Sequence, residues 1–135
     1  MTNQKPIADH LFTWPSDSPK LLGSRDTETG RYYFPSKMSN QHEKVELSRR
    51  GKLYTWTVQR FLPKTPFIGG DNPETFEPYA IGYIVLPGEI MVESRLVDID
   101  PKDLKIDMEM EVTVVPFVKN EEGEDLMIFA FKPVN

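Results

Sequence analysis

The 135-residue sequence predicts a mainly β protein: a five-stranded barrel of the OB type, preceded by a ribbon-like hairpin and a helical N-terminal arm. Five strand-like segments follow residue 51, and a short helical turn stands between the third and the fourth of them. This order of elements is that of an OB barrel, whereas a β-sandwich would show more strands at shorter and more regular spacing. We therefore expect an arm over residues 1–19, a ribbon-like piece over residues 20–48 and the barrel over residues 49–135.

The arm concentrates apolar side chains in a segment that prolines interrupt. The residues from Asp9 to Trp14 predict a short helical piece, which Pro15 ends. Leu11, Phe12 and Trp14 lie close together there, and we expect them to be buried against another surface. Two such surfaces remain possible, because the arm can dock onto its own domain or onto another subunit.

The stretch from Lys20 to Pro35 has the layout of a small zinc knuckle. Two apolar runs, Leu21-Leu22 and Tyr32-Tyr33-Phe34, flank a polar turn closed by Gly30, and this pattern predicts a hairpin.

The zinc ligands of such a knuckle are missing. Asp26 and Thr29 stand at the spacing of a Cys-x-x-Cys pair, and a second knuckle would fall within Ser39 to Glu43, where His42 is the one good ligand. A structural zinc site needs four ligands, nearly always including thiolates or several imidazoles. We therefore expect no metal, and we expect hydrogen bonds and packing of the 32–34 aromatics to replace it.

The barrel begins with an alternating segment, Lys52 to Phe61, which is rich in β-branched and aromatic residues and follows a predicted turn at Ser48 to Gly51. A long connection from Leu62 to Pro78 exceeds the usual loop length, which is typical of a functional loop or a partner contact. The remaining strands are predicted at Tyr79–Leu86, which we expect to be buried on both sides or central, and at Ile90–Leu96, Met108–Val118 and Leu126–Lys132. Between the second and third of these four, Asp98 to Ile106 predicts a helical turn with Asp100 as N-cap and Pro101 at its first position.

Composition excludes several classes of function. No apolar run approaches the roughly 20 residues of a membrane-spanning helix, and no secretion signal is visible at the N-terminus, so we expect a cytoplasmic protein. The formal net charge of −5 argues against a large nucleic-acid footprint. Because the chain has no cysteine, it has no disulfide, no thiolate metal site and no cysteine nucleophile.

No set of residues predicts catalysis. His10 and His42 lie in the arm and the ribbon and belong to no recognisable triad or metal motif. Glu109 and Glu111 alternate on one strand, as the solvated side of a half-buried strand does. We predict that the chain supplies no catalytic residue of its own.

Several segments, in this order, carry a resemblance to a known family: Leu22–Arg25 into the turn Asp26–Gly30, Phe34-Pro35, Val45–Ser48 before Gly51–Val58, Pro78–Leu86, and Ile106–Val112. They span most of residues 20 to 118. The order resembles the acyl-CoA-associated family in which a rubredoxin-like zinc ribbon precedes an OB fold. The sequence departs from the family pattern where the cysteine ligands should be, so zinc is not expected.

The resemblance implies a non-catalytic subunit beside a thiolase-like or lipid-transfer-protein-like enzyme, supporting assembly of the complex and binding of acyl-CoA. The chemistry would then lie on the partner. The residues that we expect to bury against that partner are Leu11, Phe12, Trp14, Tyr32, Tyr33 and Phe34.

The long connection suggests where acyl-CoA could be contacted. Arg60, Lys64, Phe67 and the Gly69-Gly70 backbone lie on it or next to it, between the first and second barrel strands, where OB folds often bind ligands. Cations and an aromatic ring suit the phosphates and adenine of CoA. The alternatives are an ordinary proline-stiffened loop and a partner contact, of which we favour the partner contact.

A second class of function follows from the OB prediction. Tyr54, Trp56 and Arg60 are expected on one face of the first barrel strand, where aromatics and a cation could stack the bases of single-stranded nucleic acid. The acidic balance of the chain and the lack of a basic stripe make this the alternative and not the first choice.

Overall fold

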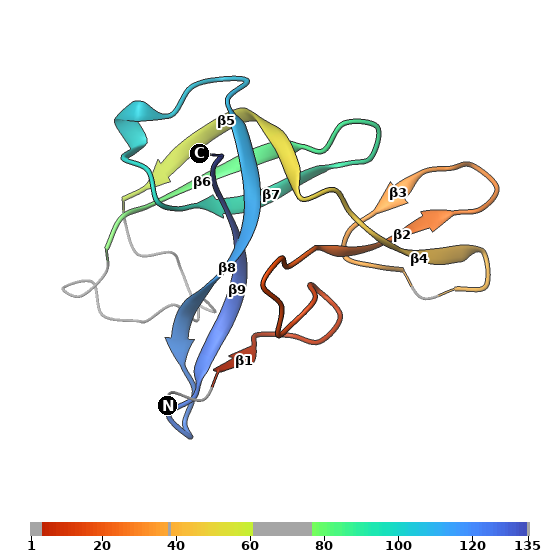
Figure 1. Cartoon of the computed structure of the whole chain (residues 1–135), viewed down its shortest axis with the longest axis horizontal. Coiled ribbons are helices and arrows are strands. Elements are labelled where there is room, and N and C mark those ends of the chain that lie inside the picture. The colour runs from red at the N-terminus through yellow and green to blue at the C-terminus, as the bar shows by residue number, and fades with distance from the viewer. Residues whose placement is uncertain (1–3, 38, 61–76, 135) are drawn as a thin grey trace.

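A computed structural model describes residues 4–37, 39–60 and 77–134 of the chain, and its larger part is a closed barrel (Figure 1). The barrel strands are β5 (Arg50–Gln59), β6 (Tyr79–Val85), β7 (Met91–Leu96), β8 (Glu109–Lys119) and β9 (Asp125–Pro133). Antiparallel pairing joins β5 to β6, β6 to β7, β8 to β9 and β5 to β8, and a parallel pairing of β7 with β9 completes the circuit. The predicted five-stranded OB-type barrel is confirmed.

The helical turn between the third and fourth barrel strands is also confirmed. A 3-10 helix, η1 (Pro101–Asp103), follows Asp100, whose side chain accepts a hydrogen bond from the backbone N–H of Lys102 at 3.1 Å. This is the capping that an aspartate followed by proline predicts.

The turn expected at Ser48 to Gly51 is wrong in its second half, because β5 already begins at Arg50. Gly51 lies inside the strand, where an added Cβ would collide with the carbonyl oxygen of Val85. The glycine therefore permits a close approach of two strands and does not mark a turn.

A second, smaller sheet forms the ribbon. Its strands are β2 (Leu22–Asp26), β3 (Tyr32–Tyr33) and β4 (His42–Glu46), in the order β3-β2-β4 with antiparallel pairing throughout. The predicted hairpin is β2 with β3. Strand β4, which pairs residue for residue with all of β2, was not predicted, because its sequence reads as polar and lacks strand-like alternation.

The arm is extended, and the helical piece predicted over Asp9 to Trp14 is wrong. Strand β1 (Gln4–Pro6) runs parallel to β9, and Phe12 forms an isolated bridge with Leu21. The arm's backbone groups bond to other segments: the N–H of Thr13 donates to the Lys20 carbonyl, and the Leu11 carbonyl accepts from Leu22. These partners replace the i to i−4 bonds that a helix would need.

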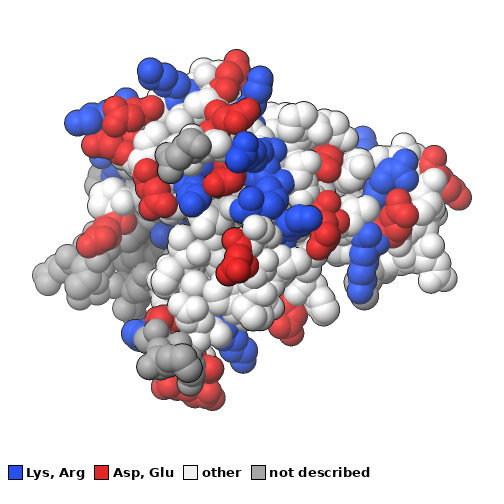
Figure 2. Space-filling view, in the orientation of Figure 1, with Lys and Arg blue, Asp and Glu red and all other residues white. Residues whose placement is uncertain are grey.

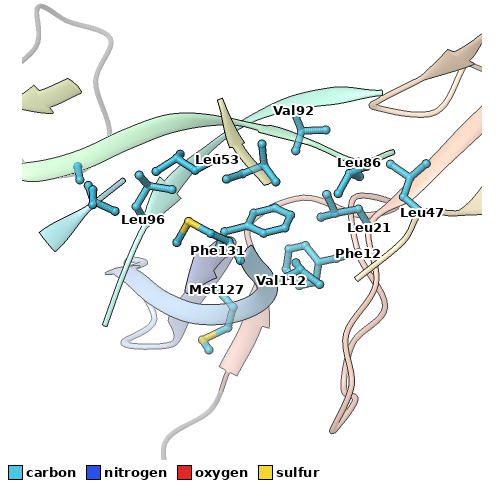
Figure 3. Close-up of a cluster of buried hydrophobic side chains, with 14 residues drawn as sticks. Phe12, Leu21, Leu47, Leu53, Leu86, Val92, Leu96, Val112, Met127 and Phe131 are labelled. Atoms are coloured by element: carbon cyan, nitrogen blue, oxygen red, sulfur yellow. The ribbon is translucent and has the colours of Figure 1, made fainter. Parts of the chain in front are cut away.

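One hydrophobic core serves all three parts of the chain (Figure 3). Phe12 from the arm and Leu21 and Leu47 from the ribbon region lie in the same cluster as Phe131 and Val112 from the barrel. Fully burying an aliphatic or phenyl side chain is worth about 1.5–3 kcal/mol, so the arm and the ribbon are anchored to the barrel by burial. No helix in the described part of the chain is long and apolar enough to cross a membrane.

Candidate functional site

The carboxylate of Asp26 organises the ribbon's first turn. Its Oδ1 accepts hydrogen bonds from the backbone N–H groups of Glu28 at 2.8 Å and Thr29 at 3.1 Å. Gln41 adds a third partner, because its Nε2 donates to Oδ1 at 3.2 Å and to Oδ2 at 3.1 Å. The N–H groups of Thr29 and Glu28, followed by Gln41 and His42, lower the pKa of Asp26. The carboxylate is therefore held in its charged form.

The two turns of the ribbon are tied together through Gln41. Its carbonyl accepts from the backbone N–H of Thr27 at 2.8 Å and from the Thr27 hydroxyl at 2.9 Å. In the second turn, Ser39 Oγ lies 2.7 Å from His42 Nδ1 and accepts from the Gln41 N–H at 3.2 Å. Hydrogen bonds thus link the turns where a zinc ion would in a ribbon with four cysteines.

The residues at the knuckle positions do not fit a structural zinc ion. The two knuckle positions hold two pairs of residues, each separated by two others: Asp26 with Thr29, and Ser39 with His42. Of these four, only Asp26 and His42 have side chains that commonly bind zinc. Oδ1 of the carboxylate is already occupied, and Oδ2 lies 3.9 Å from His42 Nε2. Glu43, the other candidate oxygen donor, is engaged with Arg25 at 3.2 Å. No group of three or more His, Cys, Asp or Glu that could hold a metal occurs among the described residues.

Of the six residues expected at a partner interface, five belong to the core shared by arm, ribbon and barrel or pack against it, whereas Tyr33 contacts His42 and Lys37 of its own ribbon. Phe12 is 5% exposed and belongs to the chain's own core, so for this residue the cover is its own domain. The others are half-buried, and Leu11, Trp14, Tyr32 and Phe34 pack against the core from outside.

Two aromatic contacts fix this region. The Phe34 and Phe129 ring centroids are 5.4 Å apart in an edge-to-face arrangement, which joins the ribbon to β9. The rings of Tyr33 and His42 are also edge-to-face, with 5.3 Å between their centroids. Nζ of Lys37 lies 4.1 Å from the centroid of the Tyr33 ring.

The proposed CoA contacts fall mostly beyond the described residues. Arg60 follows the last residue of β5 and is exposed. Lys64, Phe67, Gly69 and Gly70 lie outside the part of the chain that the structure describes.

A β-bulge separates the aromatic residues of β5. The register of β5 against β6 shifts between Leu53 and Thr55. As a result Tyr54 is 59% exposed, whereas Trp56 packs against the core. The prediction that Tyr54 and Trp56 share a face is wrong, because the extra residue of a bulge inverts the in-and-out alternation beyond it.

Three exposed apolar side chains that the sequence did not reveal lie on the outside of three neighbouring strands. Tyr54 of β5, Tyr83 of β6 and Met91 of β7 are all exposed large hydrophobic residues. Strand β6 was expected to be buried on both sides or central, and it is central between β5 and β7, but Tyr83 is 41% exposed. The nearly continuous apolar run of β6 carries no alternation that could have separated its outer face from its inner one.

Charged side chains of both signs are spread over the face seen in Figure 2, where basic and acidic groups lie next to each other. The structure accounts for one such group: Arg49 and Arg50 both lie within 3.6 Å of a carboxylate oxygen of Glu111. Arg49 also donates to the carbonyls of Pro19 and Val112, at 3.1 and 3.3 Å. Arg49 therefore joins the arm to the barrel, and both arginines are paired with Glu111 and do not form a free basic stripe.

Arg95 of β7 is a half-buried cation that two aromatic rings enclose. Its guanidinium carbon lies 3.7 Å from the ring centroid of Tyr79 and 4.6 Å from that of Phe117. Burial lowers the pKa of Arg95, although the group remains charged at neutral pH. Aromatic faces stabilise the cation here.

The sequence of this chain is similar to those of known proteins over most of its length. The family model of the ChsH2 C-terminal OB-fold domain matches residues 44–115. Over 132 residues the chain is 33% identical to the benzoylsuccinyl-CoA thiolase subunit BbsA of Thauera aromatica, covering 92% of this chain and 85% of that one. It is 32% identical to a DUF35 domain-containing scaffold protein of Methanocaldococcus jannaschii, covering 84% and 82% of the two chains. Among solved structures, an Ltp2-ChsH2(DUF35) aldolase chain has the same fold, with a TM-score of 0.61 at 21% identity and 84% coverage of each chain.

Proposed function

Because this chain belongs to the family of the ChsH2 C-terminal OB-fold domain, we propose that it is a non-catalytic accessory subunit of a thiolase-like or lipid-transfer-protein-like enzyme that acts on an acyl-CoA. The observation that carries the proposal is the similarity to a thiolase subunit along 92% of the chain. Relatives described as scaffold proteins support a role in assembly. A match of this extent includes the arm, the ribbon and the barrel.

The side chains of the described residues support placing the chemistry on the partner. His42 is engaged through Nδ1 with Ser39, and it stands beside a carboxylate that three hydrogen-bond donors already occupy. His10 lies exposed in the arm. Among the described residues, the contact of Ser39 with His42 is the one that joins an imidazole to a nucleophilic side chain, and Ser39 there belongs to the ribbon's own turn, where its Oγ also accepts from the Gln41 N–H.

The contact with the partner is proposed for the half-buried aromatic residues of the arm and the ribbon, which are Trp14, Tyr32, Tyr33 and Phe34. Half-exposed aromatic groups held in place by a rigid scaffold lose little conformational entropy on binding, which suits them to an interface. Acyl-CoA is proposed at the shared interface, and the exposed side chain of Arg60 is a cation that suits its phosphates.

The experiment is a pull-down of the tagged full chain from its native cell extract, followed by mass spectrometry of the bound proteins. Recovery of a thiolase-like or aldolase-like protein in stoichiometric amount would support the proposal, and acyl-CoA turnover by that protein with and without this chain would then test the functional link. A chain that is recovered alone under conditions that preserve other complexes would remove the accessory-subunit proposal while leaving the fold intact.

The nucleic-acid alternative is not favoured by any contact in the described residues. The bulge in β5 turns Trp56 inward, so Tyr54 and Trp56 do not form the shared stacking surface that this alternative was based on. Binding of single-stranded oligonucleotides with strong salt dependence would reverse this judgement.

A further inference from the structure

A polar hollow of about 310 Å³ lies on the ribbon beside β4. The residues that line it are Lys37, Ser39, Asn40, His42 and Lys44, none of which is acidic. Its volume is at the lower end of the roughly 300–1,000 Å³ found for small-molecule sites. The hollow therefore has the size and the donor groups to hold a small anion.

The two lysines of the hollow are not neutralised by carboxylates. Another cation of the ribbon, Arg25, pairs with Glu43 at 3.2 Å. Lys37 and Lys44, in contrast, take part in no ion pair within the described ranges of the chain. The ammonium group of Lys37 lies 4.1 Å from the Tyr33 ring centroid, which holds the cation in place without cancelling its charge.

Strand alternation keeps the nearest carboxylate along the chain away from this hollow. His42 and Lys44 of β4 point to one face of the ribbon sheet, and Glu43 between them points to the other. Asp26 stands near His42, with 3.9 Å between Oδ2 and Nε2, and its carboxylate keeps its negative charge while it accepts from Gln41 and backbone N–H groups. Glu46, on the same face of β4 as Lys44, is paired with Lys20 at 3.6 Å. The two lysines therefore outnumber the one carboxylate beside the hollow, although the whole chain has a net charge of −5.

We propose that this hollow binds a phosphate group, held by the ammonium groups of Lys37 and Lys44 and by the side-chain amide of Asn40. Two lysines match the charge of a phosphate dianion, and lysine binds phosphate as a compact point charge. The Asn40 amide is available as a donor, because it makes no hydrogen bond within the described part of the chain. The proposal concerns a ligand of this chain and is independent of the accessory-subunit role.

The phosphate can be free or can belong to an ester with a less polar tail. A second, mainly apolar cavity of about 400 Å³ shares Lys44 with the hollow; Leu11, Leu22 and Val45 are among the residues that line it, together with the acidic Asp9 and Glu46. An apolar group attached to the phosphate would lie toward this cavity, past Lys44. The two sources share one chemistry, which is phosphate recognition at the two lysines.

The test is an NMR titration of the ¹⁵N-labelled full chain with sodium phosphate at constant ionic strength. We expect saturable shifts of backbone amides between residues 37 and 44. Lys37→Gln and Lys44→Gln should each weaken binding about threefold, as expected for the loss of one exposed ion contact. Lys105→Gln is the matched control, since Lys105 is exposed and has no ion pair among the described residues. Both lysines of the hollow are exposed, so dispersed spectra should show that the variants fold.

Two further titrations distinguish the sources of the phosphate. 4′-Phosphopantetheine binding more tightly than inorganic phosphate would assign a phosphate ester, and equal affinities would assign free phosphate. Pantetheine, which has no phosphate, should cause no shift at residues 37–44. The proposal is overturned if the phosphate shifts do not saturate, if both lysine variants bind as the control does, or if pantetheine binds as tightly as its phosphate.

Discussion

Gln41 donates its side-chain amide to both carboxylate oxygens of Asp26, at 3.2 and 3.1 Å, across 15 positions of the sequence. The contact joins the two turns of the ribbon, which in a zinc ribbon would be joined by the metal. A hydrogen bond to a charged partner contributes more than one between neutral groups. The ribbon is thus stabilised by directed hydrogen bonds together with the burial of Leu21 and Leu47.

The charged state of Asp26 predicts a dependence of stability on pH. Because the pKa of this carboxyl is lowered in the folded chain, the folded state binds fewer protons than the unfolded state in acid. This contribution is fully present above the unfolded pKa of about 4, and it is lost as the pH falls through the lower, folded value.

Denaturant unfolding measures this dependence when it is repeated at evenly spaced pH values from about 2.5 to about 7, a range that spans the ordinary carboxyl pKa. The difference in unfolding free energy between the native chain and Asp26→Asn should be largest near neutral pH and should shrink in acid. A difference that is constant with pH would mean that the carboxylate charge does not stabilise the ribbon.

Restoring thiolates at the knuckle should create a zinc site. The triple variant Asp26→Cys, Thr29→Cys, Ser39→Cys keeps His42 and supplies the three thiolates and one imidazole of a structural site. We expect this variant to bind one zinc ion by elemental analysis and to lose thermal stability when a chelator is added, since metal binding is then coupled to folding. The native chain, measured in parallel, should be insensitive to chelator. A triple variant that folds but stays free of zinc would show that the turns do not keep the knuckle geometry.

Substitution of two tyrosines on different surfaces distinguishes the possible partner interfaces. Tyr33 lies half-buried in the ribbon, and Tyr83 lies on the outer face of the barrel. If the half-buried aromatic residues of the arm and the ribbon meet the catalytic subunit, Tyr33→Ala should weaken co-purification about tenfold, the loss expected for a hot-spot aromatic that costs more than about 1 kcal/mol. Tyr83→Ala should leave it unchanged. The opposite result would move the interface to the exposed face of β5, β6 and β7. Phe12→Ala is unsuitable for this test, because it would open the core.

The bulge in β5 predicts unequal effects for two neighbouring aromatic residues. Trp56→Ala should lower the free energy of unfolding by about 2–3 kcal/mol, because Trp56 packs against the core without being fully buried. Tyr54→Ala should change it by less than about 0.5 kcal/mol, since its side chain is mostly exposed. Chemical denaturation of both variants provides the measurement. Equal effects would contradict the register shift between Leu53 and Thr55.

The sequence by itself determined the strands from Tyr79 onward, the η1 turn and the order of elements that makes an OB barrel. Each of these depends on a local signal: apolar runs and alternation set the strands, and Asp100 before Pro101 sets the turn. The sequence also identified Asp26 and the cluster around Tyr33 as places of interest, and the loss of the cysteines was evident from composition alone.

The tertiary structure alone decided what those residues contact. Strand β4, the parallel pairing of β1 with β9 and the Gln41 contact to Asp26 all join segments far apart along the chain, and no local period encodes such pairings. The bulge at Tyr54 has the same origin, because one extra residue exchanges the two faces of a strand without changing its composition. The polar hollow beside β4 was equally invisible: Lys37 and Lys44 converge only when the second turn folds back along the ribbon. Local propensity sets the elements, and long-range pairing sets which side chains meet.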